Sequence, residues 1–296
     1  MILPPPDLQI PITTIGRRLI DFSGKRKLEF DDITLDFYNE FKEYLIDTKN
    51  FSMNTVGKYI KTIKVFMNEA TERGLNKKMD FKSKKFKVDN EESETIYLTE
   101  SELKKMYDLD LSENTRLERV RDLFIVGCYT GLRFSDFSQI APENIKNGDF
   151  HIRTQKTDEP VIIPIHDMVS EIMEKYKDLN DNSLPPSLSN QKMNEYLKEI
   201  GKMAGLLERI KITRNKGAQR VTEIYYKYEL LTTHTARRSF ATNLYLREYP
   251  TIGIMQITGH RTERAFMKYI KVTQQQNAAK LRAFWNGKKQ NLKKVG

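Results

Sequence analysis

The sequence predicts a mainly α-helical protein of two domains, with small β-hairpins in the second. Its 296 residues are about twice the common domain length of roughly 150. Apolar residues recur at helical spacing from Ile33 onward, whereas the segments 149–165 and 209–226 alternate as β-strands do. Residues 77–95 contain few large aliphatic side chains and no sustained period, so they are predicted to link the two domains.

The first of these domains is predicted over residues 33–88. Its first helix is indicated by apolar residues at helical spacing, namely Ile33, Phe37, Phe41, Tyr44 and Leu45. Ser52 is predicted to cap a second helix that ends at Gly74. The preceding residues, 1–32, include three consecutive prolines and are interpreted as an irregular lead-in.

The second domain is predicted over residues 96–296. It opens with the pattern Thr99-Glu100-Ser101-Glu102, a capping box that starts a helix. Its first hairpin turns near Thr157, and its second turns at Asn215-Lys216-Gly217. Further helices are predicted over 167–178, 190–204, 234–247, 251–258, 262–270 and 274–285.

The composition is typical of a soluble globular protein, with 39% hydrophobic and 30% charged residues. The longest apolar run, 123–132, is about half a membrane span, and the N-terminus lacks the pattern of a secretory signal. The protein is therefore not expected to enter a membrane. With Cys128 as its only cysteine it cannot form an internal disulfide, which fits a reducing compartment, and we expect a cytoplasmic protein. The 50 Lys and Arg against 40 Asp and Glu leave a net charge of +10, which favours nucleic acid as a partner.

Several kinds of chemistry have no support in the sequence. There is no Gly-x-Gly and no phosphate-binding P-loop pattern, so an enzyme that depends on ATP or NAD is not expected. One cysteine and four histidines, without a His-x-x-x-His pair, do not indicate a zinc site. We therefore predict neither a cofactor nor a metal ion.

Six residues of the second domain form a set suited to attack on a phosphodiester. They are Arg133, Lys156, His234, Arg237, His260 and Tyr269. Arginines can clamp the non-bridging oxygens of a phosphate, and a tyrosine can act as the nucleophile. A phenol has a reference pKa near 10, so histidines or other cations must favour its ionisation, and a lysine can protonate the departing hydroxyl. Taken singly, each residue also has an ordinary structural explanation, such as an ion pair between Arg133 and Asp136.

These motifs resemble those of the tyrosine recombinases, or phage-type integrases. The matching segments are TGLRFSD at 130–136, a hairpin lysine at 156, HTARRSFAT at 234–242, TGH at 258–260, and a tyrosine nine residues after that histidine. The resemblance extends over residues 117–272 and, more diffusely, over 33–88. It implies a helical core-binding domain and a catalytic domain that close around duplex DNA as a C-shaped clamp.

The resemblance also implies a role for each residue. Arg133 and Arg237 would bind the scissile phosphate, and Tyr269 would form a 3′-phosphotyrosyl bond. His234 and His260 would assist proton transfer and orientation. That bond conserves the energy of the phosphodiester, so the reaction would need neither metal nor ATP.

Lys156 would act as the general acid toward the 5′-hydroxyl, although the uncertain hairpin register leaves Arg153 and Lys146 as alternatives. Asp136 would support the site and stands where the family commonly has glutamate. Thr258 stands where leucine is usual. Neither departure removes a reacting group.

By the same resemblance, four protomers would act on two duplexes through a Holliday junction to integrate or excise a mobile element, with accessory DNA-bending factors as possible partners. The segment 274–285 would dock on a neighbouring protomer or pack on its own domain. About thirty residues precede Ile33, so a simpler recombinase or a fragment is expected, without the arm-binding domain that many members carry. The alternatives are a type IB topoisomerase-like relaxing enzyme and an accessory DNA-binding protein that does not cleave.

Further basic residues are candidates for contact with DNA. They are Lys58, Lys61, Lys64, Lys211, Arg214, Lys216, Arg220, Arg238 and Arg261. Those of the second hairpin could equally solvate its turn, so that hairpin has no assigned role.

Overall fold

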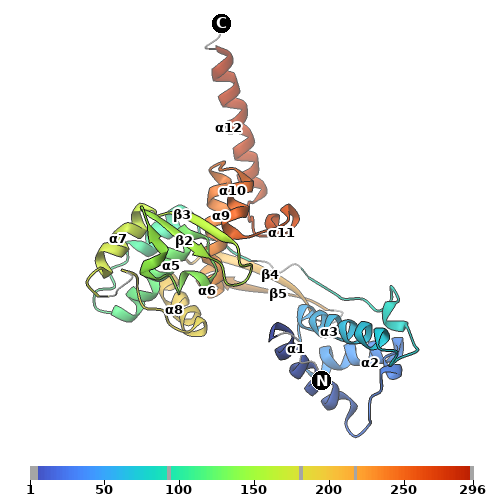
Figure 1. Ribbon diagram of the computed structural model, residues 1–296. Helices are drawn as coiled ribbons and strands as arrows, with labels where there is room; N and C mark the ends of the chain where they lie inside the picture. The colour runs from blue at the N-terminus through green and yellow to red at the C-terminus, as the bar shows by residue number, and fades with distance from the viewer. Residues whose placement is uncertain (1–5, 92–94, 180–182, 217–218, 294–296) are drawn as a thin grey trace. The chain divides into compact units, whose positions relative to one another are not determined.

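The computed structural model describes residues 6–91, 95–179, 183–216 and 219–293; of these, the side chains of residues 6–13, 214, 216, 219, 283 and 286–293 are outside the description. The protein is mostly helical, with one three-stranded and one two-stranded sheet (Figure 1), so the predicted fold class is confirmed. Contacts divide the chain into two compact units. Residues 1–94 group with 211–224, and residues 95–210 group with 225–296.

The first unit is helical and has a core rich in aromatic side chains. Its elements are α1 (Pro6–Ser23), η1 (Phe30–Asp32), α2 (Leu35–Glu43), the π-helical η2 (Tyr44–Thr48), α3 (Met53–Glu72) and η3 (Asp80–Lys82). Ser52 caps α3 as predicted, because its side chain accepts a hydrogen bond from the backbone N–H of Thr55. Phe37 and Phe41 stack at 5.5 Å between ring centroids within the core.

The predicted irregular lead-in is wrong from residue 6 onward, because residues Pro6–Ser23 form α1. A proline is compatible with the first turn of a helix, where its missing N–H costs no hydrogen bond. Ile15 is buried, and Leu19 and Phe22 pack against the same core. Pro6 therefore marks a helix start, and the apolar spacing that follows it was the informative signal.

The predicted linker is also wrong over residues 77–91, which pack on the first unit. Phe81 and Phe86 are fully buried in its core. A Cβ added to Gly57 of α3 would lie 2.0 Å from the carbonyl oxygen of Asp89, so this segment crosses α3 in close contact. The prediction failed because the segment has few aliphatic side chains, whereas two aromatic ones, Phe81 and Phe86, attach it to the core.

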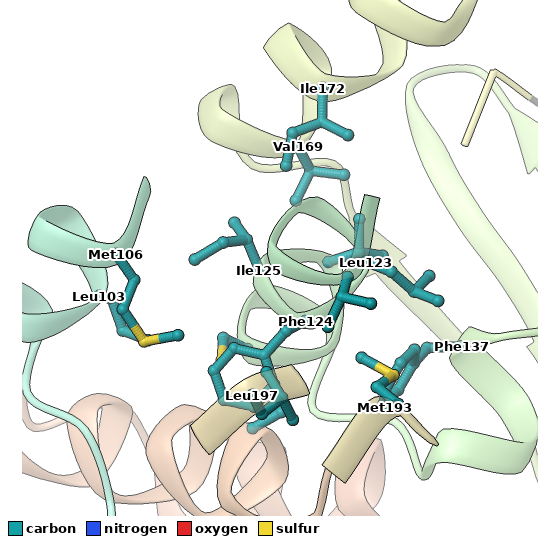
Figure 2. Close-up of a cluster of buried hydrophobic side chains, with 14 of the residues drawn as sticks. Leu103, Met106, Leu123, Phe124, Ile125, Phe137, Val169, Ile172, Met193 and Leu197 are labelled. Atoms are coloured by element: carbon teal, nitrogen blue, oxygen red, sulfur yellow. The ribbon is translucent and has the colours of Figure 1, made fainter. Parts of the chain in front are cut away.

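The second unit is built around α5 (Thr115–Thr130), which is buried on nearly all sides. Its other helical elements are α4 (Glu100–Tyr107), α6 (Phe134–Phe137), η4 (Pro142–Asn144), α7 (Asp167–Tyr176), α8 (Asn190–Met203), η5 (Lys227–Leu230), α9 (Thr233–Leu246), α10 (Thr251–Thr258), α11 (Glu263–Met267) and α12 (Gln274–Lys293). Figure 2 shows Phe124 and Ile125 of α5 among side chains from neighbouring helices. Among the described residues, no helix is long and apolar enough to cross a membrane.

The three-stranded sheet of this unit is antiparallel, in the order β1 (Ile145–Lys146), β2 (Asp149–Arg153), β3 (Pro160–Pro164). Strands β2 and β3 form the first predicted hairpin, and two buried pairs form its core face, Phe150 with Ile163 and Ile152 with Val161. Strand β1 was not predicted because it is only two residues long. The second predicted hairpin is formed by β4 (Arg209–Lys216) and β5 (Gln219–Tyr226), with Gly217 of its turn outside the described residues.

Candidate active site

The turn after α5 brings the first two arginines together. Gly131 ends α5 in the left-handed conformation, at a φ of 65°, and an added Cβ there would lie 2.3 Å from the ring of Phe240. Arg133 follows at the N-cap of α6. The Nη1 of Arg237, from α9, donates a hydrogen bond of 2.8 Å to the carbonyl oxygen of Gly131. Only glycine suits this turn, because the backbone conformation and the packing both exclude a side chain.

His234 and Arg237 both project from the first turns of α9 but differ in burial. The helix starts with a capping box between Thr232 and Thr235. Arg237 is only 1% exposed, whereas His234 is exposed. The buried arginine is therefore held rigidly by packing, and the histidine is accessible from solvent.

Lys156 lies in the turn between β2 and β3, and its side chain is exposed. Two hydrogen bonds tie this turn to the segment after Arg133. The backbone N–H of Gln155 donates to Oδ1 of Asp136 at 2.9 Å, and the Gln155 side chain donates to the carbonyl oxygen of Ser135 at 3.0 Å. Asp136 makes no ion pair with Arg133 within the described part of the chain, so the ordinary explanation of that pair does not hold.

The two alternatives to Lys156 lie elsewhere on the sheet. The Nη1 of Arg153 forms an ion pair of 3.0 Å with Asp158 across the hairpin end. Lys146 is an exposed residue of the short strand β1. Of these three residues, Lys156 is the one whose charge is found to lower the pKa of His234.

His260 and Tyr269 lie against each other beyond α10. That helix ends at Gly259, again in the left-handed conformation, so that His260 leaves the helix at once. The imidazole and phenol ring centroids are 4.4 Å apart, at an interplanar angle of 63°. The ring of Tyr269 is also 5.9 Å from Cζ of Arg237 and 6.0 Å from that of Arg238. Helix α11 ends at Met267, three residues before the predicted end, so Tyr269 lies just past it.

The pKa shifts reflect a partly buried cluster of positive charge. Burial first, and then the charges of Arg237 and Arg133, lower the pKa of His260 to about 4. Burial and the charge of Arg133 lower the pKa of Arg237 to about 10, against the opposing effect of Tyr269. Desolvation is also the main cause that lowers the pKa of His234, and four nearby cations, including Lys156, add to it. Both histidines are therefore neutral at pH 7. The arginines and Lys156 carry the positive charge of the site, and they favour the binding of an anion.

Several polar atoms at the centre of the site are buried and make no hydrogen bond within the described residues. They are Nη1 of Arg133, Nε and Nη2 of Arg237, and Oδ2 of Asp136. A buried charged N–H without an acceptor is costly, so native proteins rarely leave one unsatisfied outside functional sites. Three such N–H groups on two neighbouring arginines are suited to an oxyanion with several acceptor oxygens.

The other predicted DNA-contacting residues are spread over both units. Lys58 and Lys61 are exposed on α3, whereas Lys64 donates to the carbonyl oxygen of Phe86 at 3.1 Å. Lys211 and Arg220 are exposed on β4 and β5.

The remaining four candidates differ in what the structure describes of them. The side chains of Arg214 and Lys216 lie outside the described residues. Burial lowers the pKa of Arg238, which lies beside Tyr269, and Arg261 forms a surface ion pair of 3.4 Å with Glu159. Of the two whose side chains are described, Arg238 lies next to the cluster and Arg261 pairs with Glu159 on the surface.

Helix α12 extends to Lys293, past the predicted end at 285. Lys280 donates to the carbonyl oxygen of Tyr245 at 2.8 Å, which attaches the helix to α9. Leu281, Phe284 and Trp285 are 45%, 54% and 56% exposed, so about half of each apolar side chain faces solvent.

Two threonines touch Tyr269 and His260 and were not predicted as part of the site. Thr242 donates to the carbonyl oxygen of Tyr269 at 3.4 Å. Thr258 lies 2.8 Å from Nδ1 of His260. The sequence shows that Thr258 stands where the family usually has leucine. Its contact with His260 could not be predicted, because that contact depends on how α10 ends.

Comparison with known protein families agrees with this geometry. The family model of the phage integrase family matches residues 96–276, and that of the phage integrase SAM-like domain matches residues 12–88. The chain belongs to the phage integrase family. This confirms the resemblance to tyrosine recombinases, a family of enzymes that cleave and rejoin DNA.

Solved structures of integrases share the fold of this phage integrase family member. A lambda integrase dimer bound to a COC′ core site has a TM-score of 0.68 and 17% identity, over 90% of this chain and 89% of that chain. A Tn1549 transposon integrase in complex with circular intermediate DNA has a TM-score of 0.64 and 15% identity, over 91% and 93%. A lambda integrase tetramer bound to a Holliday junction has a TM-score of 0.65 and 17% identity, over 89% and 72%. No curated protein matches the chain.

Proposed function

We propose that this protein is a site-specific recombinase that cleaves and rejoins DNA strands through a 3′-phosphotyrosyl intermediate. The observation that carries the proposal is the set of three buried, unpartnered N–H groups on Arg133 and Arg237, next to the phenol of Tyr269. A phosphodiester supplies the acceptor oxygens that these groups lack. It also supplies a phosphorus atom for the phenol to attack.

In the proposed cleavage step, the Tyr269 phenol gives its proton to His260 and its oxygen bonds to phosphorus. The bond from phosphorus to the 5′-oxygen breaks, and Lys156 protonates that oxygen. Arg133 and Arg237 stabilise the charge that grows on the non-bridging oxygens. Since the phosphate ester is exchanged rather than hydrolysed, its energy is available for the reverse step with a new 5′-hydroxyl.

His234 is assigned to the phosphate rather than to the nucleophile. It is exposed at the N-terminus of α9, where backbone N–H groups also favour an anion. Asp136 is assigned to holding the lysine turn, through its bond with Gln155. Neither a metal ion nor a nucleotide cofactor takes part in these steps.

For the whole reaction we propose duplex DNA as substrate and four protomers that exchange strands through a Holliday junction. The lambda integrase tetramer bound to such a junction supports this assembly. The net charge of +10 is suited to phosphate backbones, so binding is expected to weaken steeply with salt. Integration or excision of a mobile element, in the cytoplasm and with accessory DNA-bending proteins, is the biological setting that we infer.

The test is covalent capture of DNA in EDTA. A library of nicked duplexes with a randomised central segment is incubated with the protein, denatured, and searched for protein–DNA adducts. Wild type is expected to form an adduct through Tyr269, and sequencing of the captured strands then identifies the target site. Tyr269→Phe is expected to form none. The matched control is Tyr249→Phe, a change to an exposed tyrosine outside the cluster, which should retain the adduct.

Each other outcome favours a different function. No adduct from wild type, together with tight binding to a defined sequence, would indicate an accessory DNA-binding protein. An adduct on any sequence, with relaxation of supercoiled plasmid and no strand exchange, would indicate a topoisomerase-like enzyme. An adduct that persists in Tyr269→Phe would show that the nucleophile is another residue.

A further inference from the structure

The contact between Thr258 and His260 restricts where the histidine can hold its proton. The Oγ1 of Thr258 lies 2.6 Å from the carbonyl oxygen of Ile254 and 2.8 Å from Nδ1 of His260. A second carbonyl oxygen, of Met255, lies 3.5 Å away. Thr258 is completely buried, so water does not replace any of these partners.

A hydroxyl has one proton, and a carbonyl oxygen can only accept. The contact of 2.6 Å with Ile254 therefore requires the hydroxyl proton to point at that carbonyl oxygen. This is the bond to the preceding turn that threonine commonly makes in helices. The oxygen of the hydroxyl is then an acceptor toward the imidazole, so Nδ1 of His260 must carry a hydrogen.

We propose that Thr258 is a positioning residue that holds neutral His260 in the tautomer with hydrogen on Nδ1, which leaves Nε2 as the proton acceptor for Tyr269. The inference rests on the proposed function and adds a residue that sets the tautomer of the proposed base. With the opposite tautomer, Nε2 would carry a hydrogen and could not accept the phenol proton. The basic nitrogen of that tautomer would be Nδ1, which lies against Oγ1 of Thr258.

The surroundings keep His260 neutral, so that its tautomer matters. Arg237 of α9 and Arg133 of the turn before α6 act on it as charges, and Tyr269 lies against it after α11. Burial and the two arginines disfavour the imidazolium form. A histidine that is neutral throughout the physiological range needs its hydrogen fixed on one nitrogen to act as a base.

The experiment compares Thr258→Val, which has the same shape without the hydroxyl, with Thr258→Ser, which keeps the hydroxyl. The rate of adduct formation on nicked DNA is expected to fall about 10- to 100-fold in the valine variant and to return close to wild type in the serine variant. The control is Thr71→Val in α3, which removes a similar bond to the preceding turn, from Oγ1 of Thr71 to the carbonyl oxygen of Met67 at 2.7 Å.

A second readout observes the tautomer without any activity. Long-range ¹H–¹⁵N spectra of ¹⁵N-histidine-labelled protein at pH 7, with His260 assigned by His260→Gln, should show a protonated Nδ1 and an unprotonated Nε2 in wild type. The valine variant should gain the other tautomer. A protonated Nε2 in wild type, or an unchanged tautomer and rate in Thr258→Val, would overturn the inference. Failure of wild type to form an adduct overturns the proposed function instead, and the spectra still decide the tautomer.

Discussion

Arg237 and Lys156 belong to the same candidate site but are held in opposite ways. Arg237 is 1% exposed, lies near the N-terminus of α9, and is bonded to the backbone of the Gly131 turn. Lys156 is exposed on a hairpin turn whose fixed contacts belong to its neighbour Gln155. The buried half of the site is preorganised, whereas the turn half depends on a few hydrogen bonds.

The difference fits the tasks that we propose for the two residues. Stabilising charge on a phosphate requires donors already aligned in a dry environment, because reorientation during the reaction would cost free energy. Protonating a leaving oxygen requires one mobile group that arrives at the right time, for which a flexible lysine on a turn is suited. Substitutions in the buried half should therefore reduce every kind of cleavage, and those in the turn half should depend on the leaving group.

The largest effect is expected from Arg237→Lys. One ammonium cannot replace Nη1, bonded to Gly131, together with the buried Nε and Nη2, which we propose bind the phosphate. Adduct formation should fall about 10³-fold, while noncovalent binding to the same DNA is largely retained. The control is Arg247→Lys, at the other end of α9, where an exposed arginine pairs with Glu100. An equal loss of binding would make Arg237 an affinity residue.

The next largest effect is expected from Lys156→Ala, at about 10²-fold on normal DNA. A substrate with sulfur in place of the bridging 5′-oxygen should be cleaved nearly as well as by wild type, because a thiolate leaves without protonation. Arg237→Lys should gain no such rescue. If Lys156→Ala is not rescued, or if Arg153→Ala is rescued instead, the general acid is assigned to the wrong residue.

A smaller effect, about 10-fold, is expected from Asp136→Ala. It removes the acceptor for the backbone N–H of Gln155 and so frees the turn that carries Lys156. Asp136→Asn keeps an acceptor oxygen and should lose less. The sulfur substrate should restore most of the activity of the alanine variant, since the hydrogen bond that is lost holds the lysine turn. No restoration would mean that Asp136 acts on the buried arginines instead.

The sequence was most informative where local chemistry decides the structure. The capping side chains of Ser52 and Thr99 are found as predicted, because each bonds to an N–H three residues away. Phe81 shows the opposite case, since its burial depends on contact with distant helices and was missed. The contact of Thr258 with His260 was equally hidden, because it depends on the left-handed exit of the chain at Gly259.

The smallest effect is expected on stability, and it tests the burial of His260 beside the arginines through the dependence of stability on pH. The pKa of His260 is about 4 in the folded protein, against about 6.5 in an unfolded chain. Between these values the unfolded chain takes up a proton that the folded protein does not. Stability should therefore rise with pH through this window and be lost as pH falls from 7 toward 4.

His260→Gln removes this proton uptake, so its melting temperature should fall less between pH 7 and pH 5 than that of wild type. Because His260 is partly exposed, we expect a difference of about 2–4 °C, the size that roughly 1 kcal/mol produces in a domain of this length. His151→Gln, on β2 outside the site, is the control and should follow wild type. A His260→Gln variant with the same pH slope as wild type would show that burial around the arginines is looser than the structure describes.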